Sequence, residues 1–147
     1  DACIDHHAHA DGRAMAEAIA KAAPDGVDGY FENVGGKTLA GAIQNMNDFG
    51  RIAICGMVAW YGGQNLDQGP MGPVLWRNML TRKLTARGFI IFDHWDDYPA
   101  FLKEVGPKVA KGEISYLEDV AEGLDAMPET FISMLKGGNM GKQIVKL

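Results

Sequence analysis

The chain has 147 residues, of which 47% are hydrophobic, and this is enough for one ordinary core and roughly one domain. Its formal charge is −5, from 14 basic and 19 acidic residues. It has no run rich in lysine and arginine, so a nucleic-acid-binding surface is not expected. No apolar stretch reaches the roughly 20 residues that cross a bilayer.

The first residue and the cysteines bear on where the protein works. The chain opens on Asp1 and shows no signal peptide, which is typical of a processed chain or a fragment. Two cysteines, Cys3 and Cys55, do not make a disulfide framework. We therefore expect a reduced, cytoplasmic protein with neither a membrane nor a nucleic acid as its partner.

Apolar runs and helical repeats alternate through the first 55 residues. The predicted elements are, in order, the end of a strand at Ala2–Asp5, a helix at Asp11–Ala23, a strand at Val27–Val34, a helix at Thr38–Met46, a turn at Asn47–Gly50 and a strand at Arg51–Cys55. This alternation favours parallel βαβ units. Continuous apolar runs are typical of parallel strands that are covered on both faces.

The second part of the chain begins with a long loop and then changes its pattern. Val58–Pro73 is a Gly/Pro/Asn loop, longer than most connections in compact domains, and such loops are often functional. The predicted elements after it are a helix at Val74–Leu80, a strand at Leu84–Phe92, a helix at Tyr98–Lys111, a strand at Ile114–Val120, a helix at Met127–Leu135, a turn at Gly137–Asn139 and a strand at Gln143–Leu147.

Ligands of open parallel sheets bind at the carboxyl ends of the strands. Three such ends are candidates here: Asn33–Gly36, Cys55–Val58 and Phe89–Phe92. Glycine lets backbone N–H groups approach a phosphate or a sugar, and Asn33 could hydrogen-bond a ribose or an amide. Ordinary strand-to-helix turns are the alternative. Neither the G-x-G-x-x-G fingerprint nor a Walker motif occurs, so periodicity alone does not establish nucleotide binding.

The four histidines do not complete a metal site. His6, His7 and His9 lie near the N-terminus, but no Cys or carboxylate follows at the spacing of a ligand set. His94 lies among aspartates in a segment that is typical of a solvated loop. We expect no metal site in this chain.

Three further side chains have two interpretations each. Cys55 ends an apolar strand, where cysteine is more often a small packed hydrophobe than a nucleophile. Trp60 and Tyr61 lie in the long loop, where aromatic rings either face a planar ligand or pin the loop. The sequence indicates no Ser/His/Asp constellation.

Three motifs in order carry a resemblance to a known family. They are Tyr30–Gly36 (YFENVGG), Phe49–Gly56 (FGRIAICG) and Met134–Lys142 (MLKGGNMGK). The chain resembles, over essentially its whole length, the medium-chain dehydrogenase/reductase superfamily. Within it, the chain is similar to the zinc-independent prostaglandin and alkenal double-bond reductases, which include leukotriene hydroxydehydrogenases and curcumin-reductase-like proteins.

The resemblance implies an α/β fold. We expect a partial Rossmann-type parallel sheet with helices on both faces, and a C-terminal strand–helix–strand tail that belongs to a GroES-like catalytic domain. Residues 1–112 would be the C-terminal part of the NADP-binding domain, and residues 113–147 the tail. The glycine-rich fingerprint, the first two Rossmann strands and most of the GroES-like domain would precede Asp1. Strand 84–92 would be the sheet edge through which such proteins form homodimers.

The resemblance also implies an activity and a set of cofactor contacts. Such enzymes transfer hydride from NADPH to the β-carbon of an α,β-unsaturated ketone or aldehyde, and they need no metal. The implied NADP contacts are Asn33, Cys55, Gly56, Met57, Val58, Tyr61, Phe89, Ile90, Ile91 and Asn139, with His6 where relatives carry a Tyr near the 2′-phosphate. Tyr61 would approach the nicotinamide ribose or the substrate and is the one catalytic candidate, and no catalytic acid is assigned. The preference for NADP over NAD rests on the resemblance, because the lysine that reads the 2′-phosphate would precede Asp1.

Two other functions stay open for the parent protein. It could be a non-catalytic Rossmann-like binding or scaffold module, or a quinone reductase of the same superfamily. We expect these 147 residues by themselves neither to bind NADPH tightly nor to turn over. The reason is that they lack the fingerprint loop and the helix N-terminus that hold the pyrophosphate.

Overall fold

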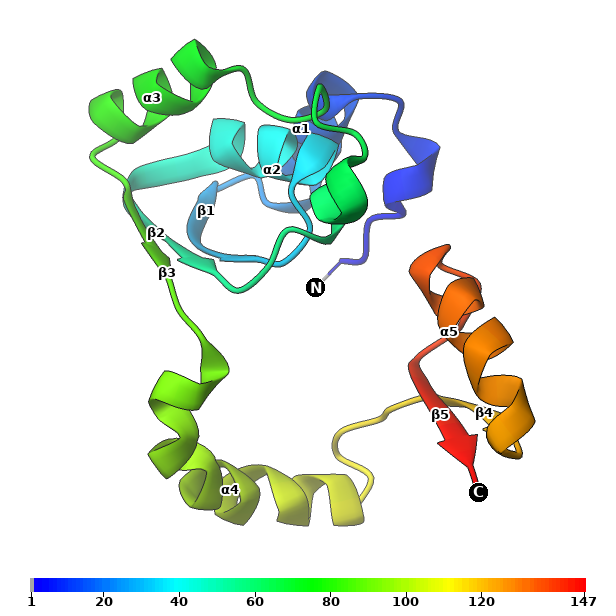
Figure 1. The fold of residues 1–147 in the computed structure, drawn as a ribbon. Coiled ribbons are helices and arrows are strands. Elements are labelled where there is room, and N and C mark those ends of the chain that lie inside the picture. Colours follow the sequence, from blue (N-terminus) through cyan, green and yellow to red (C-terminus); the bar gives the residue numbers. More distant parts are fainter. Residues whose placement is uncertain (1) are drawn as a thin grey trace. The chain divides into compact units, whose positions relative to one another are not determined.

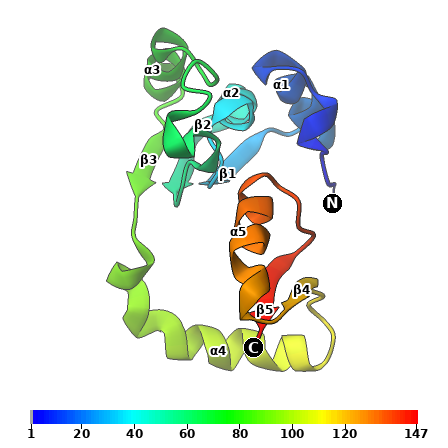
Figure 2. The ribbon, with the colours of Figure 1, turned by 45° about the vertical axis from the view of Figure 1, so that its right-hand side comes forward.

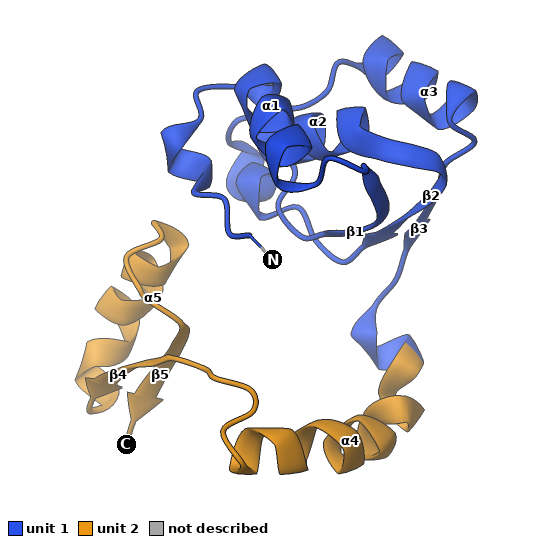
Figure 3. Cartoon of the chain, turned by 180° about the vertical axis from the view of Figure 1, so that it is seen from behind, with its two compact units in different colours: residues 1–93 blue, residues 94–147 orange. Residues whose placement is uncertain are grey.

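The computed structural model describes residues 2–147, which belong to two compact units (Figure 3). Unit 1 is Asp1–Asp93 and unit 2 is His94–Leu147. The predicted domain boundary lies later, between residues 112 and 113, so the helix at Tyr98–Ala110 falls in unit 2 rather than with the sheet that precedes it. The domain assignment itself stays a prediction.

Unit 1 is a three-stranded parallel sheet with helices between its strands (Figure 1). Its elements are η1 (His6–Ala8), α1 (Gly12–Ala22), β1 (Val27–Glu32), α2 (Gly36–Asn45), β2 (Met46–Ile54), η2 (Val58–Gly63), α3 (Gly72–Thr81) and β3 (Thr85–Gly88), and η3 (Ile91–Asp97) runs across the unit boundary. The strand order is β1-β2-β3. The predicted α/β class with a parallel sheet is confirmed.

The core of unit 1 lies between the sheet and two of its helices. Ile43 of α2 and Met46 are fully buried, and Ile52 and Leu84 complete a cluster against which Leu75 and other apolar side chains pack. Figures 1 and 2 show α1, α2 and α3 on one side of this sheet. On the sheet itself, Phe31 is 61% exposed, so no helix of unit 1 within the described residues covers it.

Local sequence signals explain where the first helix begins. The carboxylate of Asp11 accepts hydrogen bonds from the backbone N–H groups of Arg13 (3.0 Å) and Ala14 (2.9 Å). This is an N-cap, which satisfies donors that have no partner inside the helix. The cap and the buried Met15 agree with the helix predicted from the apolar repeat.

Two strand predictions are wrong because a strand also needs a neighbour. Residues 2–5 belong to no ladder; Asp5 instead accepts a hydrogen bond from the N–H of His7 (2.9 Å) and begins η1. The strand predicted at Leu84–Phe92 is shorter, because β2 ends at Ile54 and the ladder with β3 ends at Gly88. The chain then turns into η3, so Ile91 and Phe92 are not strand residues.

The turn predicted at 47–50 lies inside β2 as an irregularity in its register. Met46 and Arg51 both pair with β1, at positions only two residues apart, so the segment between them bulges. Phe49 adopts φ 63° there, and its N–H donates to the carbonyl of Arg82 (2.7 Å). The guanidinium of Arg82 donates to the carbonyls of Met46 and Gln44, at the C-terminal end of α2, where a cation is favourable.

Unit 2 is a helix followed by a strand–helix–strand motif. Its elements are α4 (Tyr98–Ala110), β4 (Glu118–Glu122), η4 (Leu124–Ala126), α5 (Met127–Leu135) and β5 (Lys142–Lys146). β4 and β5 pair in parallel, and the first of them begins later than the predicted Ile114 because its ladder with β5 begins at Glu118. The predicted strand–helix–strand tail is confirmed. None of the helices in residues 2–147 is long and apolar enough to cross a membrane.

The core predicts a stability difference between two apolar truncations. Ile43→Ala removes a fully buried side chain and should lower the free energy of unfolding by about 2–5 kcal/mol. Leu80→Ala, on α3, is the matched control, because Leu80 is 78% exposed. Urea denaturation followed by circular dichroism compares the two midpoints. Equal midpoints would contradict this assignment of the core.

Candidate functional site

The three strands of unit 1 end at one edge of the sheet, where hydrogen bonds join the segments that follow them. The carbonyl of Glu32, the last residue of β1, accepts from the N–H groups of Cys55 (2.8 Å) and Gly56 (3.2 Å). The N–H of Val58 donates to the carbonyl of Asn33 (3.2 Å). We call the segments 33–36 and 55–61 the exit loops. Because these bonds connect them, the exit loops form one backbone assembly.

Gly56 brings two polar side chains together in this assembly. A Cβ atom at Gly56 would lie 2.6 Å from Asn33 Oδ1 and 3.3 Å from the hydroxyl oxygen of Tyr61. The Asn33 amide, the backbone of Gly56 and the Tyr61 hydroxyl therefore meet at one place. Both side chains are exposed, so donors and acceptors of an amide and a phenol are presented at the carboxyl edge of the sheet.

A buried carboxylate holds the first exit loop. Glu32 is 3% exposed, and its Oε1 accepts from the N–H groups of Val34 (2.6 Å) and Gly35 (2.7 Å). Its Oε2 accepts from the hydroxyl of Tyr30 (3.1 Å). Burial raises the pKa of Tyr30, and the charge of the Glu32 carboxylate and the hydrogen bond to it act in the same direction. Sequence reasoning missed Glu32, although an acidic residue inside an apolar run before a glycine turn could have indicated it.

Trp60 and Tyr61 take different roles in the long loop. The indole Nε1 of Trp60 donates to the carbonyl of Gln68 (2.8 Å). Its ring lies against two glycines, since a Cβ atom would come 2.7 Å from it at Gly35 and 2.9 Å from it at Gly69. Trp60 therefore pins the loop, whereas Tyr61 is 56% exposed beside Gly56. The loop-pinning interpretation therefore holds for Trp60. That Tyr61 faces a ligand stays a prediction.

The third strand also delivers predicted contact residues to this edge. The N–H of Phe89 donates to the carbonyl of Ile54 (3.2 Å), and its ring lies edge-on to that of Phe31, with 6.0 Å between centroids. Ile90 and Ile91 follow it and are exposed. In the second exit loop Cys55, Met57 and Val58 are exposed as well, so the prediction that Cys55 is a packed small hydrophobe is wrong.

Two of the predicted contacts lie away from the exit loops. His6 is exposed in η1, with its ring 3.9 Å from that of His7 between centroids. Asn139 lies in unit 2, in the turn between α5 and β5, where its side-chain Nδ2 donates to the carbonyl of Gly141 (2.8 Å). The part of both residues in cofactor binding stays a prediction. Across residues 2–147 no group of three or more His, Cys, Asp or Glu could hold a metal ion.

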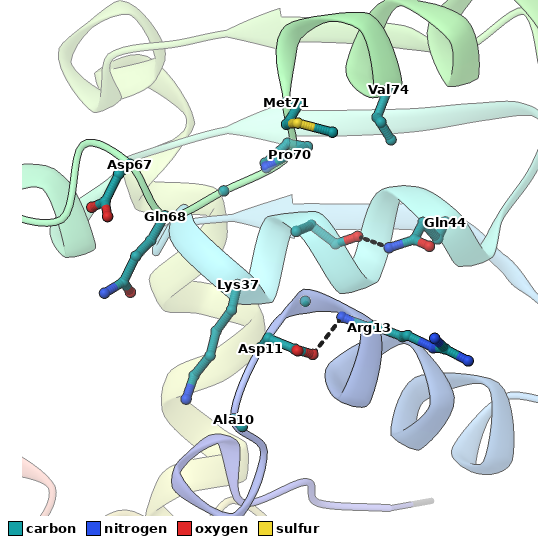
Figure 4. Close-up of a pocket in the computed structure, with 13 residues that line it drawn as sticks. Ala10, Asp11, Arg13, Lys37, Gln44, Asp67, Gln68, Pro70, Met71 and Val74 are labelled. Atoms are coloured by element: carbon teal, nitrogen blue, oxygen red, sulfur yellow. Dashed lines mark hydrogen bonds between the residues drawn. The ribbon is translucent and has the colours of Figure 1, made fainter.

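One pocket of unit 1 lies beside the predicted site rather than in it. A pocket of about 610 Å³ is bounded by the start of α1, one face of α2 and the loop before α3 (Figure 4). Its lining includes Asp11, Arg13, Lys37, Gln44 and Gln68. None of the predicted cofactor contacts lines it. The predicted site is instead the open edge formed by the exit loops.

The fold and the exit loops together define a class of protein. The sheet is parallel, its connections are helical, and glycine and polar side chains gather at the carboxyl ends of its strands. This is the arrangement in which doubly wound α/β proteins bind nucleotides. Comparison with known proteins identifies the family within this class.

The chain belongs to the zinc-binding dehydrogenase family, whose profile matches residues 1–106. It is 40% identical over 131 residues to the NADP⁺-dependent 2-alkenal reductase of Nicotiana tabacum, which covers 89% of this chain and 37% of the relative. It is 39% identical over 149 residues to the NADPH-dependent curcumin reductase of Escherichia coli, covering 100% of this chain and 42% of the relative. The predicted resemblance to the double-bond reductases of the medium-chain superfamily is confirmed.

The fold of this chain is also similar to that of a solved structure. CurA of Vibrio vulnificus, crystallised with NADPH, superposes with a TM-score of 0.84 at 37% identity, over 99% of this chain and 43% of that protein. The chain therefore spans about two fifths of the length of the relatives it matches.

The contact between Gly35 and Trp60 predicts how the first exit loop responds to a methyl group. Gly35→Ala meets both a left-handed backbone (φ 81°) and the indole ring, so it should cost more than the strain alone. Gly62→Ala is the control, since Gly62 has φ 72° with open space around it and should cost about 1–2 kcal/mol. Thermal unfolding of both variants measures the difference. A Gly35→Ala variant as stable as Gly62→Ala would contradict the contact.

Proposed function

We propose that the whole protein to which this chain belongs is an NADPH-dependent oxidoreductase that reduces the C=C bond of α,β-unsaturated ketones and aldehydes. The observation that carries the proposal is the meeting of Asn33, Gly56 and Tyr61 at the carboxyl edge of a parallel sheet. The names of three relatives support it: an NADP⁺-dependent 2-alkenal reductase, an NADPH-dependent curcumin reductase and a prostaglandin reductase.

The exit loops suit the nicotinamide half of NADPH. The lack of a side chain at Gly56 leaves the space between Asn33 and Tyr61 open, and a Cβ atom would close it. An amide and a phenol can both donate and accept hydrogen bonds, as ribose hydroxyls and a carboxamide require. Backbone groups of 55–58 and of Phe89, Ile90 and Ile91 would complete the contact in unit 1, with His6 and Asn139 as further contacts.

The chemistry needs little from the protein beyond position and polarity. When bound, NADPH supplies the hydride that adds to the β-carbon of the substrate. The protein must hold the nicotinamide and present donors to the negative charge that develops on the carbonyl oxygen. Tyr61 is the candidate donor in this chain, because its hydroxyl is exposed beside Gly56.

A side chain at Gly56 should weaken NADPH binding, whereas the same change at a control glycine should not. In the whole protein, Gly56→Ala should raise the Kd for NADPH by about 10-fold or more, the equivalent of about 1.4 kcal/mol. Gly29→Ala is the matched control, because Gly29 lies in β1 with open space around its Cβ position. Nicotinamide fluorescence measures both. An unchanged Kd in Gly56→Ala would contradict the proposed site.

Measuring which substrates the whole protein reduces distinguishes the proposed double-bond reductase from a quinone reductase and from a non-catalytic module. Oxidation of NADPH by the whole protein should be seen with a small panel of enones and enals. Oxidation with quinones alone would favour a quinone reductase of the same superfamily. Binding of NADPH without turnover of any enone, aldehyde or quinone would favour a non-catalytic binding or scaffold module.

The 147 residues by themselves should bind NADPH weakly and show no turnover. They contain the exit loops but no G-x-G-x-x-G loop, whose helix N-terminus would bind the pyrophosphate. Titration of this polypeptide with NADPH, followed by nicotinamide fluorescence, should give no saturation at low-micromolar concentrations. Saturation in that range would show that the exit loops suffice, and would contradict this prediction.

The remaining assignments concern partners and setting. We propose a homodimer through the edge strand β3, because β3 pairs with β2 on one side only among the described strands and an open edge favours pairing with another chain.

We also propose that residues 113–147 belong to the catalytic domain and that the protein works in the cytoplasm. Cys3 and Cys55 are free thiols, which suits a reducing compartment.

A further inference from the structure

We infer that Glu32 is a positioning residue for the cofactor edge: its buried carboxylate fixes the turn that presents the Asn33 amide to Gly56. The inference rests on the proposed function, since it assigns a role in holding NADPH. Glu32 lies within the Tyr30–Gly36 motif but is not among the predicted cofactor contacts. Glu32 does not face the open edge itself, because its side chain is buried.

The geometry gives Glu32 two separate connections to the exit loops. Its side-chain Oε1 accepts from the N–H groups of Val34 and Gly35, which follow Asn33 directly. Its backbone carbonyl accepts from the N–H groups of Cys55 and Gly56 in the other loop. Asn33 therefore lies between a residue that is anchored to β2 and two N–H groups that are anchored to the carboxylate. This arrangement limits where its side chain can point.

Burying the Glu32 carboxylate costs free energy that an apolar side chain at this position would not cost. Burying a charge is expensive unless hydrogen bonds compensate it. Here three donors do so: two backbone N–H groups at Oε1 and the Tyr30 hydroxyl at Oε2. Each of the two oxygens thus has its own task. Oε1 holds the turn, and Oε2 accepts from the hydroxyl of the partly buried Tyr30.

Because the two carboxylate oxygens have different partners, substitutions can remove the hydrogen bonds of one oxygen and leave those of the other. Glu32→Asp keeps the carboxylate but shortens it by one methylene, so it can no longer reach both N–H groups of the turn. Glu32→Ala removes the acceptor altogether. Glu32→Gln keeps one acceptor oxygen for the turn, and its amide can donate to the Tyr30 oxygen. Tyr30→Phe is the control, because it removes the bond to Oε2 and leaves the turn untouched.

The test measures NADPH binding and turnover of the whole protein for each variant. We expect Glu32→Ala and Glu32→Asp to raise the Kd and the KM for NADPH by about 10-fold, which corresponds to about 1.4 kcal/mol. The KM for the enone should stay within about 2-fold, as should the Kd for NADPH in Glu32→Gln and Tyr30→Phe. A merely structural Glu32 would lower the melting temperature without this split between the two KM values.

A second readout is independent of NADPH and of the folding of the alanine variant. Hydrogen exchange of the Val34 and Gly35 amides should become about 10-fold faster in Glu32→Asp and stay unchanged in Tyr30→Phe. Unchanged exchange, or a Glu32→Asp protein that binds NADPH as tightly as the wild type, would overturn the inference. Failure of the wild type to bind NADPH would overturn the proposed function instead, while the exchange rates would still decide whether Glu32 holds the turn.

Discussion

The structure of the candidate site depends on hydrogen bonds that converge on one residue at the end of β1. The carbonyl of Glu32 accepts two N–H groups from the loop after β2, and its carboxylate accepts two from the loop after β1 itself. Buried backbone donors must find acceptors, and here both exit loops find them at the same place. The positions of Asn33 and Gly56 at the polar edge follow from this convergence.

The core of unit 1 holds α2, which follows the turn at this edge, in place on the sheet. Ile43, Met46, Ile52 and Leu84 fix α2 on the sheet, and α2 begins directly after the turn that Glu32 holds. Trp60 also connects the long loop to this turn, because its ring lies against Gly35 and its Nε1 donates to the carbonyl of Gln68. Unit 2 is different, because a two-stranded sheet is too small to cover a helix face, and apolar residues of α5 such as Phe131 and Leu135 stay exposed. Under the proposed assignment to a catalytic domain, that face would pack against residues of the same domain.

The sequence predicted what depends on local patterns and missed what depends on partners. The helix after Asp11 follows from its cap and its apolar repeat, and α5 has the predicted bounds. The ends of strands were less predictable: β3 is shorter than expected because the end of β2 limits its ladder. Likewise the carboxyl edge was predictable from the glycine and asparagine types there. The role of Glu32 was not, because it depends on burial and on the direction of two backbone N–H groups.

The most direct test of the central claim is a crystal structure of the whole protein with NADPH bound. We predict that the nicotinamide ribose half lies against Asn33, Gly56 and Tyr61. We also predict that the Glu32 carboxylate accepts hydrogen bonds from the N–H groups of Val34 and Gly35 in that complex. A nicotinamide bound away from these residues, or a turn at 33–36 that rearranges to admit it, would contradict the account.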